Sequence, residues 1–236
     1  MVIDIHDLEF RWHPDGETVL SIENLQVDPG EHLFVEGPSG SGKSTLLSLL
    51  AGVTTAQAGS VRVLDRPLER LGSVERDHFR ADHVGYIFQM FNLIPYLSVI
   101  ENVMLPCQFS ARRRANALAR CKGLEAEARR LLGDLDMDHP ELLGRAVTTL
   151  SVGQQQRVAA ARALMGSPEL LIADEPTSSL DADRRESFIR LLFEECRQAG
   201  STLVFVSHDA ALEHLFHRTV NLARNNKRPG TLTCAA

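Results

Sequence analysis

A glycine-rich segment between an apolar strand and a helix constrains the fold more than any other part of this 236-residue chain. The segment "GPSGSGKST" covers residues 37–45, and residues 37–44 fit the pattern G-x-x-x-x-G-K-[ST]. The run "HLFVEG" that leads into it predicts a short strand, and "KSTLLSLLAG" predicts a helix that ends at Gly52. A strand, turn and helix of this kind are typical of an α/β domain.

The residue types in this segment suit the binding of phosphate groups. Glycines let backbone N–H groups turn inward around phosphate oxygens, and the N-terminus of the following helix adds a partial positive charge. Lys43 is placed to reach the β- and γ-phosphates of a nucleotide, and the Ser44 hydroxyl to coordinate Mg²⁺. The alternative is a glycine-rich turn that binds nothing. The predicted phosphate-binding residues are Gly37, Pro38, Ser39, Gly40, Ser41, Gly42, Lys43, Ser44 and Thr45.

Two acidic residues follow a second apolar run. In "LLIADEP", four apolar residues predict a strand buried on both faces, and Asp174 and Glu175 come directly after them. A carboxylate in this place suits Mg²⁺ coordination, so Asp174 is predicted to hold the ion through water. Glu175 is predicted to take a proton from the attacking water. The alternative is a pair of surface acids.

Strands and helices alternate along most of the chain. Around "HPDG", residues 2–11 and 18–27 alternate apolar and polar side chains, which predicts a β-hairpin. Residues 98–133 have a mostly helical pattern and look like an insertion. The alternation elsewhere predicts a largely parallel sheet covered by helices. Further strands are expected in "SVRVLD", "HVGYIFQ" and "TLVFVS", and further helices at residues 151–166, 181–199 and 209–216.

Composition excludes some classes of protein. A formal net charge of −6 argues against a nucleic-acid binder that relies on a general positive field. The four cysteines form no CxxC pair and are expected to be free thiols. The start "MVIDIHDLEF" lacks the basic and apolar regions of a signal peptide, and no run is long enough to cross a bilayer. Arg112, Arg113 and Arg114 predict a solvated helix face, with contact to anionic lipid as the alternative.

Five motifs together carry a family resemblance. The glycine-rich segment, "LSVGQQQR", "LLIADEP", "SSLD" and "VSHD" occur in the order found in ATP-binding cassette (ABC) ATPases, which the chain resembles over residues 1–224. The resemblance implies ATP hydrolysis with Mg²⁺. It also implies a single domain, residues 1–236, with a P-loop NTPase (RecA-like) core, a mainly parallel sheet and an N-terminal antiparallel β-subdomain. A helical subdomain at about residues 90–165 is inserted in that core.

The resemblance also explains the segment "LSVGQQQR", residues 150–157, here called the signature segment. In the family, two ATPase subunits pack head to tail, and each signature caps the γ-phosphate that the other subunit binds. A helix N-terminus with a serine hydroxyl and an open glycine backbone suits that purpose. Ser151 and Gly153 are expected to touch phosphate, with Gln154 near the nucleotide. Val152 stands where glycine is usual, and its side chain crowds the cap only if it points at the nucleotide.

Four more positions take roles from the resemblance. Gln89 matches the glutamine that touches Mg²⁺ and the attacking water and links to the membrane subunit, and His208 matches the histidine that contacts the γ-phosphate. Asp181 matches an aspartate that signals across the dimer interface, although helix capping is a compatible role. Trp12 is expected to stack on adenine. The alternatives at this last position are a core tryptophan and stacking by Phe10.

The predicted function is that of the energy-coupling subunit of a membrane transporter. The segment "FQMFNLIPYLSVIENVMLP" resembles the lipoprotein-release and macrolide-export branch, whose members serve lipoprotein extraction, efflux or envelope signalling. The alternatives are the ATPase of an amino-acid importer and a soluble ABC ATPase outside transport. Expected partners are a second ATPase subunit, as a homodimer, and integral membrane permease subunits, with no nucleic acid. The expected location is the cytoplasm, on the inner face of the cell membrane through the permease.

Overall fold

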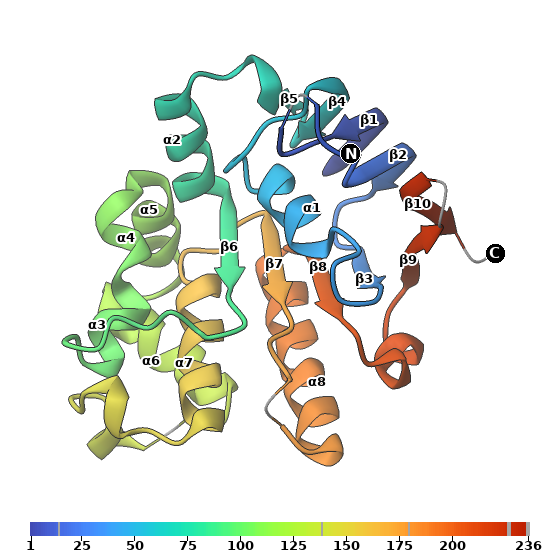
Figure 1. Ribbon diagram of the computed structural model, residues 1–236. Helices are drawn as coiled ribbons and strands as arrows, with labels where there is room; N and C mark the ends of the chain where they lie inside the picture. The colour runs from blue at the N-terminus through green and yellow to red at the C-terminus, as the bar shows by residue number, and fades with distance from the viewer. Residues whose placement is uncertain (14, 138, 179, 226–227, 235–236) are drawn as a thin grey trace. The chain divides into compact units, whose positions relative to one another are not determined.

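The computed structural model of the protein describes residues 1–236 except 14, 138, 179, 226–227 and 235–236 (Figure 1). The chain divides into two compact units: Met1–Arg80 with Thr202–Ala236 forms unit 1, and Ala81–Ser201 forms unit 2. The first boundary falls within helix α2 (Ser73–His83), and the second lies just before strand β8 (Thr202–Ser207). The predicted "HPDG" turn and the "SSLD" segment each include one residue outside the described chain.

Unit 1 contains the predicted antiparallel β-subdomain. Strand β1 (Ile3–Phe10) pairs antiparallel with β2 (Leu20–Val27), which confirms the hairpin. The other edge of β1 pairs with β4 (Ala58–Val63), and β4 pairs with the short β5 (Arg66–Pro67). The order β2-β1-β4-β5 brings the apolar side chains of the alternating segments onto one buried face.

Unit 1 also contains parallel strands that lead to the phosphate-binding segment. Strand β3 (His32–Glu36) lies between β8 and β9 (Arg218–Asn225) and runs parallel to both. The final strand, β10 (Arg228–Cys234), pairs antiparallel with β9. Side chains of β3 are buried, and the ring of Phe34 stacks on that of Phe205 with centroids 6.2 Å apart. These strands confirm the predicted α/β class with a mainly parallel sheet.

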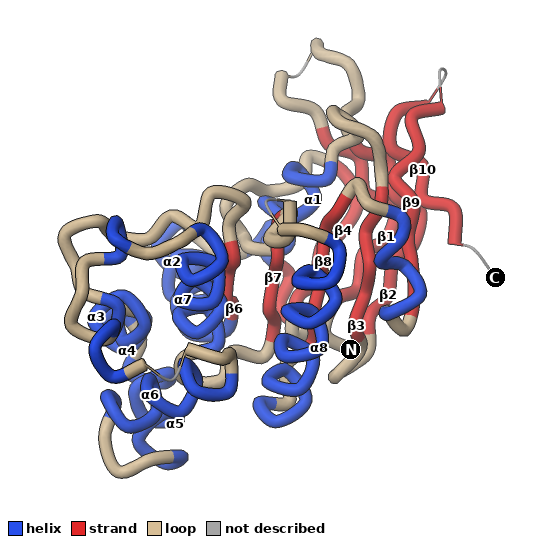
Figure 2. The backbone as a smooth tube through the Cα atoms, turned by 90° about the horizontal axis from the view of Figure 1, so that it is seen from below, coloured by secondary structure: helices blue, strands red, loops and turns tan. Residues whose placement is uncertain are grey.

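Unit 2 combines two parallel strands with most of the helices. Strands β6 (Val84–Ile87) and β7 (Leu170–Asp174) pair in parallel, and β7 has the bounds expected from "LLIAD". Helix α7 (Val152–Leu164) lies between β6 and the cluster of helices α3 to α6, as both views show (Figures 1 and 2). The remaining helices are α3 (Val99–Met104), α4 (Pro106–Phe109), α5 (Ala111–Arg120), α6 (Leu124–Asp134) and α8 (Ala182–Ala199).

Three segments of the chain differ from the sequence analysis. The expected helix at residues 209–216 is a 3₁₀ turn, Ala210–Leu215, because its backbone bonds run from Leu212 to Asp209 and from Phe216 to Glu213. Helix α2 was not predicted, since it is polar and buries only Phe79. No element was assigned to residues 218–234, where β9 and β10 form.

The prediction for the arginine run is wrong at one residue. Arg113 is buried, not solvated, because its guanidinium donates to the carbonyls of Met165 at 2.7 Å and Ala163 at 2.5 Å. These carbonyls belong to the C-terminal end of α7, where backbone acceptors lack partners within the helix. Arg112 is exposed and pairs with Glu169.

The structure bears on two expectations drawn from composition, which concern the state of the cysteines and a membrane-spanning segment. Cys107, Cys121 and Cys196 are free thiols, whereas the side chain of Cys234 is outside the described part. None of the helices in the described ranges has both the length and the apolar character needed to cross a bilayer.

The buried side chain of His32 in unit 1 predicts acid sensitivity. Burial, with the nearby ring of His217, lowers the pKa of His32 from 6.5 to about 4. Between pH 6.5 and about 4 the unfolded chain therefore binds a proton at this position that the folded chain does not. We expect the free energy of unfolding to fall as the pH is lowered through this range, and to fall less in His32→Gln than in the wild type. Denaturant melts at pH 7 and pH 5 measure both losses; equal losses contradict the prediction.

Candidate active site

The phosphate-binding segment, residues 37–45, joins β3 to helix α1 (Lys43–Leu50) as a tight turn in unit 1. Gly40 and Gly42 have φ angles of 76° and 95°, in the left-handed region that glycine tolerates. Gly42 occupies the N-cap of α1, no side chain caps the helix there, and its first turn has no acid. The first backbone N–H groups of α1 are therefore donors that the helix itself does not use. This end of the helix suits an anion.

Close packing explains two of the glycines. A Cβ on Gly37 would come within 2.5 Å of Ser41 Oγ and 2.9 Å of the Leu222 carbonyl oxygen. A Cβ on Gly42 would come within 2.6 Å of the Leu20 side chain. The Ser41 hydroxyl is buried and has no hydrogen-bond partner among the described residues. A buried polar atom of this kind fits a segment built to receive a polar ligand.

The cation of the segment lies over the turn. Lys43 is 8% exposed, and its Nζ donates to the carbonyl oxygens of Gly37 at 2.6 Å and Pro38 at 3.1 Å. Ser44, the next residue, is exposed, as the predicted role in Mg²⁺ coordination requires. The ammonium and the backbone donors of α1 thus belong to the same turn.

His208 follows a strand that neighbours β3. Strands β3 and β8 run parallel with Glu36 opposite Ser207, so the phosphate-binding segment and His208 leave the same edge of the sheet. His208 is exposed. The structure therefore brings these two predicted parts of the site together within unit 1.

Trp12 is a surface residue. It is 59% exposed and touches Phe10 edge-on, with ring centroids 5.0 Å apart. This exposure rules out the alternative of a core tryptophan. Phe10 is 1% exposed and has no face free to stack on a base, which rules out the second alternative. Adenine stacking by Trp12 stays a prediction.

The two predicted acids stand at the carboxyl end of β7 in unit 2. Asp174 accepts a hydrogen bond from the phenol of Tyr86 on β6, and burial together with this carboxylate raises the pKa of Tyr86. Tyr86 therefore remains a donor at physiological pH and holds the Asp174 carboxylate in place. Glu175 has a φ of 44°, a backbone strain that is uncommon for a residue with a side chain. Strain of this kind concentrates at functional positions, in agreement with the role predicted for Glu175.

Gln89 follows strand β6, at the edge where β7 ends. Ile87 pairs with Ala173, so Gln89 and Asp174 leave their strands at the same edge of unit 2. Gln89 is exposed and begins a loop, residues 88–98, here called the Gln89 loop. The buried side chain of Asn102 on α3 binds this loop through the backbone of Ile94, at 2.8 and 3.1 Å.

The signature segment forms the N-terminus of α7. Ser151 is the N-cap: its hydroxyl accepts from the Gln154 N–H at 3.3 Å, and its own N–H donates to Gln154 Oε1 at 2.9 Å. This reciprocal pair is a capping box. Val152 is 50% exposed, so its side chain points out of the protein.

Asp181 is the N-cap of α8 and accepts from the Arg184 N–H at 3.0 Å. The capping role considered in the sequence analysis is therefore present. The side chain is exposed. A role in signalling across a dimer interface stays a prediction.

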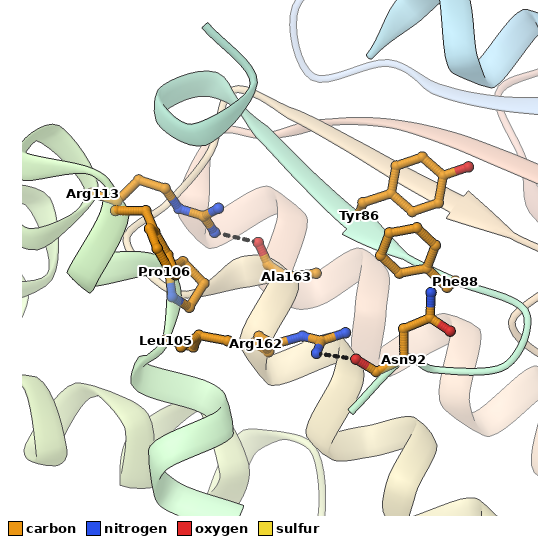
Figure 3. A pocket seen from close by; sticks show the side chains of 9 residues that line it. Tyr86, Phe88, Asn92, Leu105, Pro106, Arg113, Arg162 and Ala163 are labelled. Carbon is orange, nitrogen blue, oxygen red and sulfur yellow. Dashed lines mark hydrogen bonds between the residues drawn. The ribbon is translucent and has the colours of Figure 1, made fainter. Parts of the chain in front are cut away.

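Sequence reasoning missed the residues that support the site. Tyr86 binds the carboxylate of Asp174. Asn102 and Arg162 bind backbone carbonyls of the Gln89 loop. A pocket of about 210 Å³ opens beside that loop (Figure 3). Of these three residues, Tyr86 had a signal in the sequence, because it lies on the predicted strand that leads to Gln89. The pocket is lined by Tyr86, Phe88, Asn92, Leu105, Pro106, Phe109, Arg113, Arg162 and Ala163.

Comparison with known proteins finds one family. The family described as ABC transporter matches residues 20–178. The uncharacterized ABC transporter ATP-binding protein YbbA of Escherichia coli K12 is 39% identical over 224 residues, which are 94% of each chain. The lipoprotein-releasing system ATP-binding protein LolD of Geobacter metallireducens is 38% identical over 224 residues, 94% of this chain and 95% of its own.

Solved structures of an ABC transporter cassette also match this chain. The dimeric structure of MJ0796, a bacterial ABC transporter cassette, matches with a TM-score of 0.80 and 31% identity, covering 98% of this chain and 96% of its own. A dimeric post-hydrolysis state of the same cassette bound to ADP and Pi matches with a TM-score of 0.80 and 30% identity, at the same coverage.

The position of Trp12 predicts a fluorescence signal for nucleotide binding. Trp12 is the one tryptophan of the chain, and stacking on adenine should quench its emission. We expect ATP to quench wild-type fluorescence in a saturable way. Lys43→Ala should weaken the apparent affinity about 10- to 100-fold, because a charged hydrogen-bond donor to phosphate is lost. Saturable binding of radiolabelled ATP without quenching would show that Trp12 does not contact the base.

Proposed function

Because the chain belongs to the family of ABC transporter ATP-binding proteins and is an ATPase of that family, we propose that it is the energy-coupling subunit of a membrane transporter complex. In the proposed cycle, ATP closes a dimer of two such subunits and hydrolysis opens it. The motion passes to membrane subunits. The observation that carries the proposal is an exposed apolar surface on unit 2, beside the Gln89 loop.

That surface is formed by large apolar side chains of residues 88–109. Met90, Tyr96 and Phe109 are 80%, 85% and 74% exposed, and Phe88 and Phe109 line the pocket beside the loop. Exposed aromatic residues around a pocket are typical of a protein-binding site. We propose that a cytoplasmic helix of a permease binds here with its apolar face.

The proposed chemistry assigns each predicted residue a task. Residues 37–45 hold the phosphates of ATP through backbone N–H groups, the Ser41 hydroxyl and the Lys43 ammonium. Glu175 accepts a proton from the attacking water, and His208 donates a hydrogen bond to the γ-phosphate. Trp12 stacks on adenine.

The donor set also fits Mg²⁺. Bound there, the ion would supply positive charge against the negative charge that develops on the phosphate during hydrolysis. Ser44, Gln89 and Asp174 are the proposed ligands, Asp174 through water, and Tyr86 orients the Asp174 carboxylate. Such a site needs few protein ligands, since Mg²⁺ retains waters and takes substrate oxygens. No group of three or more His, Cys, Asp or Glu side chains that could hold a metal occurs in the described ranges.

We further propose that the signature segment acts on a second subunit. The N-terminus of α7 is exposed at Ser151 and Val152, as a group that caps another subunit's nucleotide must be. In the proposed homodimer, Ser151 and Gly153 touch the γ-phosphate, Gln154 lies near the nucleotide and Asp181 lies at the interface. The dimeric MJ0796 cassette, 31% identical, supports this arrangement.

The proposed branch is the lipoprotein-release and macrolide-export type. Support comes from LolD proteins at 34–38% identity over 87–94% of this chain. In this proposal the membrane subunits have large extracytoplasmic domains, and the ATPase is held at the cytoplasmic face of the membrane through them.

The proposed role of Glu175 predicts a trapped state. Glu175→Gln retains the shape of the side chain but removes its basicity, so we expect turnover to fall at least about 100-fold while ATP still binds. The variant should elute as a dimer in ATP and Mg²⁺ and as a monomer without them, and Lys43→Ala added to it should abolish the dimer. Rapid hydrolysis would overturn the assignment of the base. A monomer with bound ATP would overturn the proposed dimer.

The exposed surface predicts a specific membrane partner. Tagged Glu175→Gln protein should recover a multi-span protein with a large extracytoplasmic domain from detergent-solubilised membranes, as identified by mass spectrometry. Added to Glu175→Gln, Phe109→Asp should abolish recovery of that partner. As a single change it should leave the ATPase rate within about twofold of wild type, since no phosphate ligand changes. Val74→Asp, at an exposed valine on α2, is the matched control and should retain the partner.

The identity of the recovered protein separates the remaining functions. A permease without a large extracytoplasmic domain would replace the proposed branch with that of an amino-acid importer. Recovery of only soluble or ribosomal proteins would overturn the transporter proposal and leave the ATP chemistry intact.

A further inference from the structure

A buried arginine of the signature helix binds the turn that follows Gln89. Arg162 lies in the last turn of α7 and is 8% exposed. Its guanidinium donates to the carbonyl oxygen of Asn92 at 2.7 Å and of Phe91 at 2.6 Å. Figure 3 shows the side chain reaching from α7 to the backbone of Asn92. Both hydrogen bonds go to main-chain atoms of the Gln89 loop.

The turn that Arg162 binds is strained. Phe91 has a φ angle of 60°, which is unfavourable for a bulky side chain, and Asn92 follows with a φ of 47° in the same left-handed region. The Phe91 N–H donates to the Phe88 carbonyl at 2.9 Å, and the Asn92 N–H to the Met90 carbonyl at 2.6 Å, so the turn closes around Gln89. A strained turn persists only where its surroundings hold it. The two carbonyls that point at Arg162 are one such support.

The chemistry of the side chain suits this task. A guanidinium is planar and offers a fixed fork of donors, which can hold two neighbouring carbonyls at once. Burial lowers the pKa of Arg162, but an arginine stays charged across the physiological range. Its hydrogen bonds are therefore charge-assisted and shorter than those of a neutral donor.

The second anchor of the Gln89 loop comes from a different helix. Asn102 on α3 binds Ile94, Leu97 and Ser98. The earlier part of the loop is bound by Arg162 instead, through the carbonyls of Phe91 and Asn92. The part of the loop next to Gln89 is therefore tied to α7, and the part farther along the chain is tied to α3.

We propose that Arg162 is a positioning residue, which sets the place of Gln89 relative to α7 and so couples the signature segment to Gln89. Helix α7 begins at the Ser151 cap and ends beside Arg162, so one rigid element of about 20 Å joins the two. Movement of the α7 N-terminus on a partner's nucleotide then moves the turn that holds Gln89. This inference rests on the proposed role of Gln89 in the Mg²⁺ and water shell.

Arg113 offers a matched control. It is also a buried arginine of unit 2, and it also donates to backbone carbonyls, at 2.7 Å to Met165 and 2.5 Å to Ala163. Its hydrogen bonds go to the end of α7 and to Val84, not to the Gln89 loop. A general loss of packing should affect variants at both arginines, whereas a loss of loop position should affect Arg162 alone.

The test is a double-mutant cycle in steady-state ATPase kinetics. We expect Arg162→Lys to lower kcat about 10-fold with the KM for ATP within about twofold, because the fork is lost and Gln89 is displaced. Added to Gln89→Ala, the same change should lower kcat by less than about twofold further, since it acts through a residue already removed. By contrast, the effects of Arg113→Lys and Gln89→Ala on kcat should multiply in the double variant.

Hydrogen exchange gives a readout that does not depend on activity. Arg162→Lys and Arg162→Gln should raise amide exchange in residues 88–93 and leave residues 94–98 protected, while Arg113→Lys should leave both segments unchanged. Either Arg162 variant suffices if the other does not fold.

The outcomes separate the inference from the function on which it rests. Multiplicative effects of Arg162→Lys and Gln89→Ala, or unchanged exchange in residues 88–93, overturn the positioning role while the function of Gln89 stands. A normal kcat for Gln89→Ala overturns the proposed function of Gln89 and the inference with it.

Discussion

The candidate phosphate site depends on the N-terminus of helix α1, which no side chain caps. Other helices satisfy some of their first N–H groups with a side chain, as Ser151 does for α7 and Asp181 for α8. Helix α1 has glycine at this place and no acid in its first turn. Strand β3, which leads into this helix, is buried at all but its last residue. Leu20 and the Leu222 carbonyl lie where a Cβ on Gly42 or Gly37 would clash, so the fold excludes any larger residue there.

Local chemistry made much of the fold predictable. Strands β7 and β8 are continuous apolar runs that end at polar residues, and both have the bounds that the sequence predicts. Helix α2 is polar overall and buries only Phe79, so it has too few apolar residues for the sequence to predict it as a core-facing helix. Strand β9 pairs with β3, which lies 185 residues earlier, and such pairing has no local signature.

The candidate site shows the same division. The glycines, Lys43, Asp174 and Glu175 were predictable because phosphate and Mg²⁺ require particular residue types at fixed spacing. Arg113 and Arg162 were not, because their partners are backbone carbonyls 29 to 71 residues away, and a carbonyl has no residue identity. Because the sequence does not reveal such partners, it predicts a solvated face for the whole arginine run. Identifying the supporting residues therefore needs the structure, whereas the groups predicted to touch the ligand follow from residue type and spacing.

Glycine in the signature segment follows a different physical rule from glycine in the phosphate-binding turn. A Cβ on Gly153 would meet only the Leu180 side chain, at 3.9 Å, and the residue has ordinary helical geometry. The fold of this chain thus does not require glycine there. A requirement, where one exists, comes from whatever approaches the exposed end of α7. Val152 places two methyl groups on that same exposed end, and so makes this chain's α7 N-terminus more apolar and more crowded than glycine would. In the proposed dimer, the partner's nucleotide approaches Val152 together with the donors of Ser151 and Gly153, so this side chain limits how closely the nucleotide can approach.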